Sequence, residues 1–461
     1  MSIDVLSGRR GGILLHLTSL PSPHGIGDLG PAARAFADWC SRTGFTVWQV
    51  LPVNPIGPGN SPYSGKSAFA IEPLLLSLED LHDGGLLPAT ALRPPRVLRC
   101  GAIRYREVRR FKEPRIHAAF QRWSRKGGLR STSFRAFCRA QSHWLDDWCA
   151  DRPGNPDEHA FSQFMLDKQW RRLRSYAANR GVGLIGDVPI FVHADSTDVR
   201  TRPDLFRLTR RGTPTVVTGV PPDDFCRDGQ LWGHPHYDWA SHRREGFQWW
   251  IDRFRRALEL FDAIRIDHFI GFVRLYEVSA RAKTARRGVW RRSPGRAILK
   301  ALQRALGPLP IIAEDLGAVT PAVRRLRDDF GLPGMRIAQW GWFREGSPDA
   351  PANHPEHCVC YPGTHDNDTA RGWFRTLPPD ARRRFADATG CSRAASAPGA
   401  MIKACLASPA RLRIIPMQDL LGLGSAARMN RPGTPRGNWR WRLDRIPEET
   451  LSGLDGILRA S

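Results

Sequence analysis

Short apolar runs alternate along the chain with stretches that read as helices. Pro31 opens one helical stretch over residues 32–42, Gly44 ends it, and the apolar run 45–51 predicts a strand. The same order of helix, glycine and strand returns within residues 169–185. These units predict an α/β protein, because helices and strands follow one another along the chain.

Later in the chain the order is reversed, and a strand precedes its helix. Residues 309–313 form a short apolar run, and Thr320 with Pro321 begins a helix that reaches Phe330 before Gly331. Strands that alternate with helices predict a parallel sheet, either closed into a barrel or open.

A segment of about 80 residues, near 83–160, differs from this pattern because it is rich in arginine and tryptophan. Its apolar positions at helical spacing include Phe134, Phe137, Trp144 and Trp148. We expect a helical insertion subdomain there, within one catalytic domain that spans residues 1–461, since barrels reach this length with insertions.

Acidic residues end several of the predicted strands. Asp267, Glu314 and Asp366 each follow a short apolar run, and Asp187 follows the run 183–185. In a parallel barrel the carboxyl ends of all strands lie on one face, so we expect these carboxylates to converge.

Arg265 and Asp267 are two residues apart in a predicted strand, so their side chains point to the same side. A fixed arginine keeps a neighbouring aspartate ionised, and an ionised aspartate can act as a nucleophile. A second carboxyl in a less compensated place can stay protonated and act as an acid. Cleavage of a glycosidic bond with retention needs this division between two carboxyl groups.

Each acid also has a purely structural explanation. Asp267 suits a helix cap, Glu314 suits a helix start, where the dipole stabilises an acid, and residues 365–369 suit an ordinary turn. One such residue alone is weak evidence, whereas three acids in the same strand-end context favour chemistry.

Two aromatic residues in turn-rich segments are consistent with a sugar substrate. Tyr63 lies within residues 60–64 and Trp232 within residues 229–233. Exposed aromatic faces stack on pyranose rings, although either side chain could instead anchor a half-buried loop.

The net charge of +24 raises the possibility of nucleic-acid binding. Only seven of the 69 basic residues are lysine, and the arginines are spread along the chain without a long basic tract. This distribution indicates a general preference for arginine over lysine in the composition, so we expect no nucleic-acid partner.

No apolar stretch approaches the roughly 18 residues of a membrane span, and residues 1–12 lack a signal-peptide pattern, so we expect a cytoplasmic protein that does not enter a membrane. Nine scattered cysteines argue against a disulfide framework and none has zinc spacing, so mostly buried free thiols are expected.

At many ordered positions the chain resembles the 4-alpha-glucanotransferases known as amylomaltases or disproportionating enzymes, glycoside hydrolase family 77. The resemblance covers nearly the whole chain except the helical insertion. The matching runs are GILLHLTSLP at 12–21, SPY at 61–63, SAF at 67–69, IGDVPIFV at 185–192, GVPPD at 219–223, GQLWG at 229–233, YDW at 237–239, RIDHF at 265–269, AEDLG at 313–317, GLPGMR at 331–336, GTHDNDT at 363–369, QDLLG at 418–422, RMN at 428–430 and GNWRWR at 437–442.

The resemblance implies a (β/α)8 TIM barrel with helical and loop insertions and no metal or organic cofactor. It implies that Asp267 is the nucleophile, Glu314 the general acid/base and Asp366 the carboxylate that stabilises the transition state. It also implies substrate-binding positions, which are Tyr63, Asp187, Gln230, Trp232, Arg265, His268, His365 and Asn430. The expected substrates are a maltodextrin or other alpha-1,4-glucan donor and a glucose or glucan acceptor.

Some positions depart from the family pattern, and they leave the acceptor and chain-length preference open. They are Glu72, His193, Arg200, His234, where asparagine is common, and Ile270, where arginine is frequent. The oligomeric state is not predicted.

Three other functions remain open from the sequence. The nearest is an alpha-1,4-glucan hydrolase on the same barrel. The second is a metal-dependent hydrolase that uses His16, His193 and Asp366, although the chain lacks a His-x-His pair after its first strand. The third is a glucan-binding protein with a decayed site, which three intact acids argue against.

Overall fold

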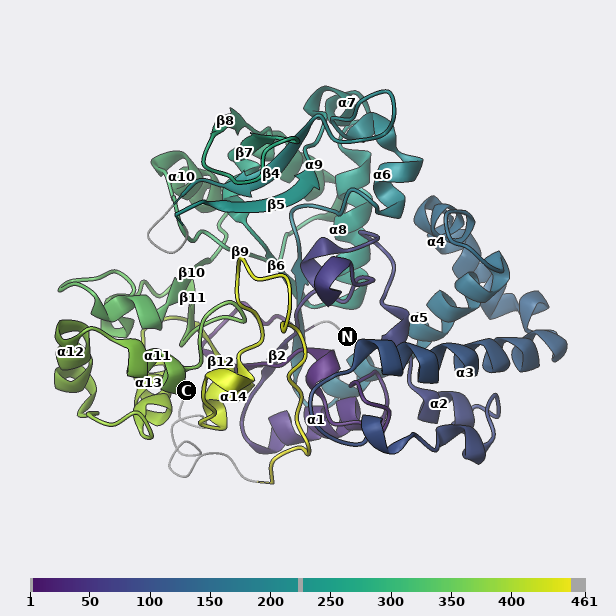
Figure 1. Cartoon of the computed structure of the whole chain (residues 1–461), viewed down its shortest axis with the longest axis horizontal. Helices are drawn as coiled ribbons and strands as arrows, with labels where there is room; N and C mark the ends of the chain where they lie inside the picture. Colours follow the sequence, from purple (N-terminus) through teal and green to yellow (C-terminus); the bar gives the residue numbers. More distant parts are fainter. Residues whose placement is uncertain (1–2, 223–226, 449–461) are drawn as a thin grey trace.

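Eight parallel strands close into a barrel in the computed structural model, which describes residues 3–222 and 227–448 (Figure 1). The strands follow one another around the barrel in chain order, each hydrogen-bonded to the next, so the predicted α/β class and TIM barrel are confirmed. They are β1 Arg10–Leu14, β2 Val47–Gln49, β3 Gly183–Val188, β6 Ala263–Ile266, β9 Ile311–Ala313, β10 Gly334–Ile337, β11 Cys358–Tyr361 and β12 Leu412–Pro416.

The barrel strands are buried on both faces, which is why they read as continuous apolar runs rather than as alternating ones. Side chains such as Leu14, Ile185, Ile312 and Val359 form one cluster, and their neighbours in each strand belong to the larger cluster that includes the helices. The barrel interior is therefore a packed core, and the only room for chemistry is at its ends.

Helices cover the barrel and fill the long connections. The longer ones are α1 Pro31–Arg42, α3 Tyr105–Arg125, α4 Thr132–Ala150, α5 Pro156–Ala178, α8 Gln248–Leu260, α9 Gly295–Leu306, α10 Pro321–Asp329, α12 Pro379–Thr389 and α13 Ala397–Ala407. The shorter ones are α2 Leu78–Asp83, α6 Thr197–Thr201, α7 Trp239–Arg244, α11 Ala370–Thr376 and α14 Met417–Leu420.

The predicted elements match with shifted ends. The helix after Pro31 ends at Arg42 as expected, whereas the strand expected over 45–51 is only β2, Val47–Gln49. The helix expected from residue 169 begins at Pro156, where Asn155 caps it by accepting a hydrogen bond from the backbone N–H of Asp157.

A four-stranded antiparallel sheet lies beside the barrel and was not predicted. Its order is β5-β4-β7-β8, with bounds β4 Val216–Val220, β5 Gln230–Pro235, β7 Arg274–Ser279 and β8 Gly288–Arg292. The sheet stands above β6 and β9 in Figure 1, next to the strand ends where the acids were expected. It therefore extends the barrel face that carries the site.

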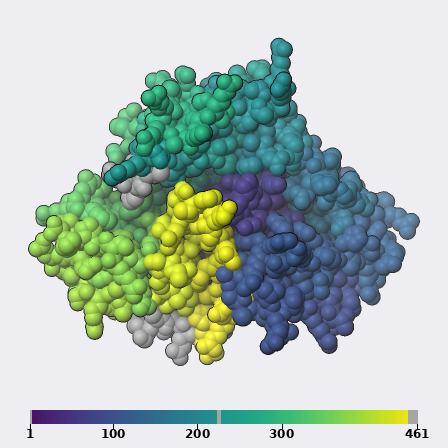
Figure 2. Space-filling model, viewed as in Figure 1, coloured from purple at the N-terminus to yellow at the C-terminus, as the bar shows by residue number. Residues whose placement is uncertain are grey.

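Helices α3 and α4 lie within the segment near 83–160 and form, with α2 and α5 at its two ends, the blue lobe on the right of Figures 1 and 2. Phe134, Phe137, Trp144 and Trp148 are all buried there, as their helical spacing predicts. Phe134, Phe137 and Phe164 form ring contacts that join α4 to α5.

The chain after α14 runs across the face shown in Figure 2 as the yellow segment, between the blue lobe and the green part of the chain. Its backbone is held by the N–H of Leu443, which donates to the carbonyl of Ser19, and by the N–H of Trp439, which donates to that of Met429. This segment brings residues from the end of the chain to the barrel mouth.

Eight cysteines lie in the described residues, all are free and six are buried, in line with the prediction. The ninth, Cys226, lies outside the described residues. In the described part of the chain no helix combines the length and apolarity needed to cross a membrane.

Candidate active site

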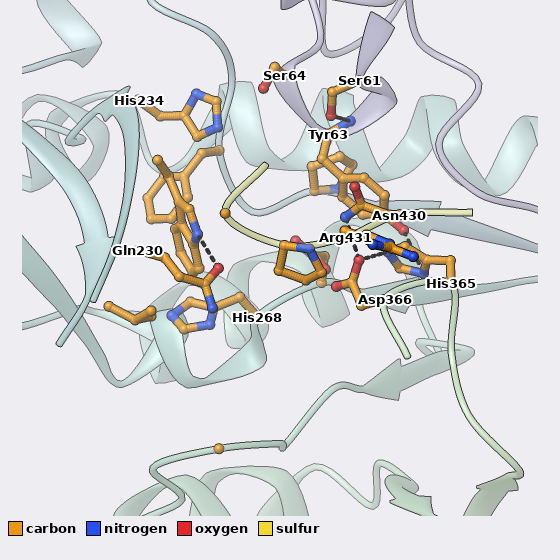
Figure 3. A pocket seen from close by; sticks show the side chains of 18 of the residues that line it. Ser61, Tyr63, Ser64, Gln230, His234, His268, His365, Asp366, Asn430 and Arg431 are labelled. Atoms are coloured by element: carbon orange, nitrogen blue, oxygen red, sulfur yellow. Dashed lines mark hydrogen bonds and ion pairs between the residues drawn. The ribbon is translucent and has the colours of Figure 1, made fainter. Parts of the chain in front are cut away.

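A cleft of about 620 Å³ opens at the carboxyl ends of the barrel strands (Figure 3). The carboxylates predicted from the strand-end pattern do converge there. Of the predicted site residues, the cleft is lined by Tyr63, Gln230, Trp232, Asp267, His268, Glu314, His365, Asp366 and Asn430.

Arg265 and Asp187 lie beneath the cleft rather than in its lining. The Arg265 side chain is only 4% exposed, and its Nη1 donates to both carboxylate oxygens of Asp187, at 2.8 and 2.7 Å. Its Nη2 lies 3.1 Å from Asp267 Oδ1 and 3.3 Å from Glu314 Oε2. One buried guanidinium therefore holds three carboxyl groups in fixed positions.

The backbone fixes the two acids that face the cleft. Asp267 follows β6 directly, and its N–H donates to the carbonyl of Val188 on β3. Glu314 follows β9, and its carboxylate accepts a hydrogen bond from the backbone N–H of His268. His268 adopts φ +51°, an uncommon left-handed conformation for a residue with a side chain, which turns this N–H toward Glu314.

Burial, together with the charges of Asp267 and Asp366, raises the pKa of Glu314 to about 8, although Arg265 and the His268 N–H oppose this shift. Three acids around one cation cannot all be ionised at little cost, and with this pKa Glu314 is mostly protonated at neutral pH.

The ionisation of Asp267 differs from the sequence-based expectation. We expected Arg265 to be the dominant influence, but burial is larger and raises the pKa of Asp267 above its usual range, while Arg265 opposes that rise. The expectation underestimated how strongly burial at the end of β6 disfavours the charged form of Asp267.

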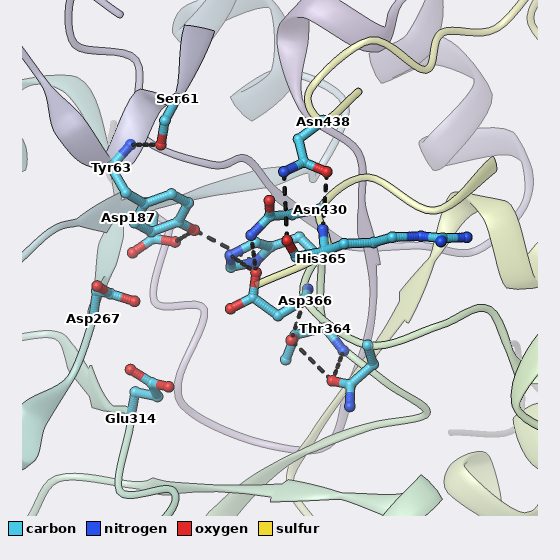
Figure 4. Close-up of polar contacts among 12 residues, drawn as sticks. Ser61, Tyr63, Asp187, Asp267, Glu314, Thr364, His365, Asp366, Asn430 and Asn438 are labelled. Carbon is cyan, nitrogen blue, oxygen red and sulfur yellow. Dashed lines mark hydrogen bonds and ion pairs between the residues drawn. The ribbon is translucent and has the colours of Figure 1, made fainter. Parts of the chain in front are cut away.

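Tyr63 and His365 lie side by side in the cleft, near Asp187 (Figure 4). The Tyr63 hydroxyl donates to Asp187 Oδ2 at 2.6 Å and lies 3.4 Å from His365 Nδ1. Trp439 packs against both rings, at 5.6 and 5.8 Å between centroids. Trp439 lay in a motif that carried the family resemblance, but no role was predicted for it, because nothing in the sequence links residue 439 to residue 63.

Asp366 lies apart from Glu314 in Figure 4 and is held by polar neighbours. Its Oδ1 accepts a hydrogen bond from Asn430 Nδ2 at 2.6 Å and lies 3.3 Å from His365 Nε2. Arg428 donates to its backbone carbonyl. With 45% of its side chain exposed, Asp366 is the most accessible of the three acids.

Gln230, Trp232 and His268 form one wall of the cleft. Trp232 Nε1 donates to Gln230 Oε1 at 3.3 Å, and the Trp232 ring meets the His268 ring edge-on at 4.9 Å. Burial lowers the pKa of His268 to about 4, so this imidazole is neutral at physiological pH. The wall therefore offers an aromatic face and neutral polar groups.

The residues proposed for a metal-dependent hydrolase are not assembled into a ligand set. His16 faces a small cavity behind His365, and His193 packs on His234. Among the described residues the ligand atoms of His24, Asp28 and Glu79 do lie close together, but the Lys112 ammonium occupies that cluster, 3.0 Å from Asp28.

Of the five positions that depart from the family pattern, His234 and Ile270 line the cleft. Glu72 is buried, and its carboxylate accepts hydrogen bonds from the N–H groups of Ile56 and Leu74. Arg200 pairs with Asp151 and Asp195 at the surface. The cleft also includes residues to which the sequence analysis gave no role, among them Pro58, Gly59, Ser61, Ser64, Trp290, Arg431 and Asn438.

Comparisons with known proteins identify the family. The model of a family described as 4-alpha-glucanotransferase matches residues 15–152 and 151–447. The chain belongs to the 4-alpha-glucanotransferase family. It is therefore an enzyme of the glycosyl-transferring type, and its substrates are alpha-glucans.

Individual relatives cover almost the full length. A 4-alpha-glucanotransferase of Thermus thermophilus is 41% identical over 97% of both chains. A chloroplastic/amyloplastic 4-alpha-glucanotransferase of Solanum tuberosum is 40% identical over 94% of this chain and 82% of its own. The amylomaltase of Streptococcus agalactiae, solved in complex with acarbose, superposes with a TM-score of 0.90 at 31% identity and 98% coverage of both chains.

Proposed function

We propose that the enzyme moves a segment of an alpha-1,4-glucan to the 4-hydroxyl of glucose or another glucan by two displacements at Asp267. In the first, Asp267 attacks the anomeric carbon while Glu314 protonates the leaving oxygen. In the second, Glu314 acts as a base on the 4-hydroxyl of the incoming acceptor, which takes the glucosyl chain from Asp267.

The single observation that carries this proposal is the contact of one Arg265 nitrogen with both acids. Because Asp267 Oδ1 and Glu314 Oε2 lie 3.1 and 3.3 Å from the same Nη2 atom, the two oxygens are no farther apart than the sum of these distances. Two oxygens within this limit are compatible with the separation of about 5–5.5 Å between the carboxyl groups of retaining enzymes, which react through a covalent intermediate.

The remaining predicted residues have roles that fit their positions. Asp366, accessible and held by Asn430, would bind hydroxyls of the distorted donor sugar. Tyr63 and His365 would shape the donor subsite, while Arg265 and Asp187 would act from below by positioning Asp267. Gln230, Trp232 and His268 would contact the sugar on the other side of the cleavage point.

Transfer exceeds hydrolysis only when an acceptor binds well and water is kept from the intermediate. The test is to incubate purified protein with maltotriose. Longer maltodextrins plus glucose, with a constant total of reducing ends, are expected. A net rise in reducing ends would instead support an alpha-1,4-glucan hydrolase.

The site assignment has its own test. Asp267→Asn is isosteric and removes the nucleophile, so transfer should fall by at least about 10³-fold. Asp238→Asn is a matched control, because Asp238 only caps α7 through the N–H of Ser241. Full activity of Asp267→Asn would contradict the assignment.

The same proposal covers the organisation of the chain. Residues 1–461 would form one catalytic domain, with the helices near 83–160 as an insertion subdomain within it. The cytoplasmic location remains a prediction from the sequence, and no cofactor is required by the proposed steps.

A further inference from the structure

One wall of the cleft continues beyond the residues that the proposed function uses. It runs through ring contacts from His268 to Trp232 at 4.9 Å, from Trp232 to Phe191 at 6.1 Å, and from Phe191 to His234 at 6.1 Å. His234 in turn meets His193 edge-on at 6.1 Å. The wall therefore leads away from Glu314, which contacts the backbone of His268.

Local backbone geometry sets the position of His234. Gln230, Trp232 and His234 occupy alternate positions of β5 and all line the cleft. The pairing of β5 with β4 shifts register between Val217 and Gly219, and Gly233, at φ +79°, lies in the stretch of β5 opposite this shift. Bulges of this kind redirect a side chain next to a site.

His234 is a buried polar side chain with one ring nitrogen that no described residue pairs with. The residue is only 7% exposed, and its Nδ1 is buried with no hydrogen-bond partner among the described residues. The ring is held by stacking on Phe191, with 27° between the planes. Burial lowers the pKa of His234 to about 3, so the imidazole is neutral and offers one donor and one acceptor, as a sugar hydroxyl does.

The two sides of the cleft have different roles in the proposed reaction. Figure 3 shows Tyr63, His365, Asp366 and Asn430 together on one side, and His268, Gln230 and His234 on the other. The first group surrounds the donor sugar. Since Glu314 faces the leaving oxygen and later the acceptor hydroxyl, the wall that continues from it lies along the acceptor.

We propose that His234 is a specificity-determining residue of an acceptor subsite, where it hydrogen-bonds a glucose unit beyond the first acceptor sugar. This inference rests on the proposed function, because it needs Glu314 to mark the acceptor side. The first acceptor sugar lies next to Glu314 and His268, Trp232 provides the following surface, and His234 is reached only by a longer glucan. His193 is a positioning residue that braces the ring.

The test compares acceptors of different length with an unlabelled maltodextrin donor at saturation. Isotopically labelled glucose, maltose and maltotriose are the acceptors, and kcat/KM is measured for each. His234→Phe keeps the stacked ring but removes the hydrogen-bonding atoms. For this variant, kcat/KM with glucose should be unchanged, and kcat/KM with maltotriose should fall about three- to tenfold through KM.

Two further variants complete the design. His234→Asn retains a hydrogen-bond donor and an acceptor. Its kcat/KM with maltotriose should therefore fall less than that of His234→Phe. Using two variants also guards against the misfolding of one of them. Leu231→Ala is the matched control on the same strand, because Leu231 is 36% exposed and does not line the cleft. Its acceptor profile should equal that of the wild type.

Three outcomes would overturn the inference. An equal fall in kcat/KM with glucose and with maltotriose, in a variant that is folded, would mean that His234 acts at the reaction centre or has a structural role. If the fall in kcat/KM of His234→Phe depended on the length of the donor and not on that of the acceptor, the wall would have to be assigned to the donor. Wild-type protein that transfers to none of the acceptors would overturn the proposed function, and the inference with it.

Discussion

The ring of Tyr63 stacks on the ring of His365, with centroids 4.8 Å apart and planes 11° from parallel, although 302 residues separate them in the chain. The Tyr63 hydroxyl reaches on to Asp187, which is bound to Arg265. A loop near the start of the chain is thereby connected, through Arg265, to the acid proposed as nucleophile.

Tyr63→Phe should lower activity much more than stability. The variant keeps the stacked ring and loses one hydrogen bond to a carboxylate, so kcat/KM with maltotriose should fall about ten- to a hundredfold. The free energy of unfolding, measured in urea, should decrease by only about 1 kcal/mol, because Arg265 still binds both oxygens of Asp187. Tyr176→Phe removes a similar bond, to Asp38 at the surface, and should leave kcat/KM unchanged.

Arg265→Lys should abolish activity and weaken the fold. A lysine cannot contact Asp187, Asp267 and Glu314 together, so a buried carboxylate is left unpaired, which costs about 3 kcal/mol or more. We expect a fall in kcat/KM of at least about 10³-fold and a lower urea midpoint. Arg256→Lys disturbs a comparable buried pairing with Asp167, so it should lose stability but keep activity. Equal stability of Arg265→Lys and the wild type would contradict the pairing.

Much of the barrel could be predicted because its strands are buried on both faces. The runs 263–266, 309–313 and 358–361 stand out as apolar and correspond to β6, β9 and β11. Barrel geometry then requires that the acids after them meet at one face. Their separate roles did not follow from spacing, and they were assigned by the resemblance to a known family.

The second sheet could not be predicted by the same reasoning. Strand β5 contains Gly233 at a positive φ, and β8 is rich in arginine, so neither has a clear apolar pattern. The sheet depends on pairing of β4 with β7, across more than fifty residues of intervening chain. The cleft wall with Trp232 and His234 was missed as a unit for this reason, although Trp232 was identified individually.

The pH dependence of transfer should show a fall on the alkaline side near the pKa of Glu314, about 8, because Glu314 must carry a proton to act as the acid. Stability should change in the same window. The folded pKa exceeds the ordinary value of 4.5, so between these values the folded state binds more protons, and the free energy of unfolding decreases as pH rises from about 4.5 to 8.

Glu314→Gln provides the control for both effects. The amide cannot titrate, so the decrease in unfolding free energy between pH 5 and pH 9 should become smaller than in the wild type. Urea unfolding at several pH values measures this difference, and kcat/KM profiles measure the alkaline limb. An identical pH dependence of stability in the two proteins would show that another group holds the proton.

Asn430→Asp should convert a neutral support of Asp366 into a pH-dependent one. The wild-type amide donates to Asp366 Oδ1 at 2.6 Å, and two carboxylates at that distance cannot both be ionised without a large penalty. The pair will therefore share a proton at low pH, which restores the hydrogen bond, and lose it at higher pH. We expect kcat with maltotriose to be strongly reduced at pH 8 and partly recovered near pH 5, relative to the wild type at each pH.

Asn438→Asp is the matched control. Among the described residues the Asn438 side chain bonds only to Arg431 and Thr434 in the neighbouring loop, so this variant should show no such recovery. A loss of activity in Asn430→Asp that is independent of pH would mean that the amide acts through its shape rather than through its hydrogen bond to Asp366.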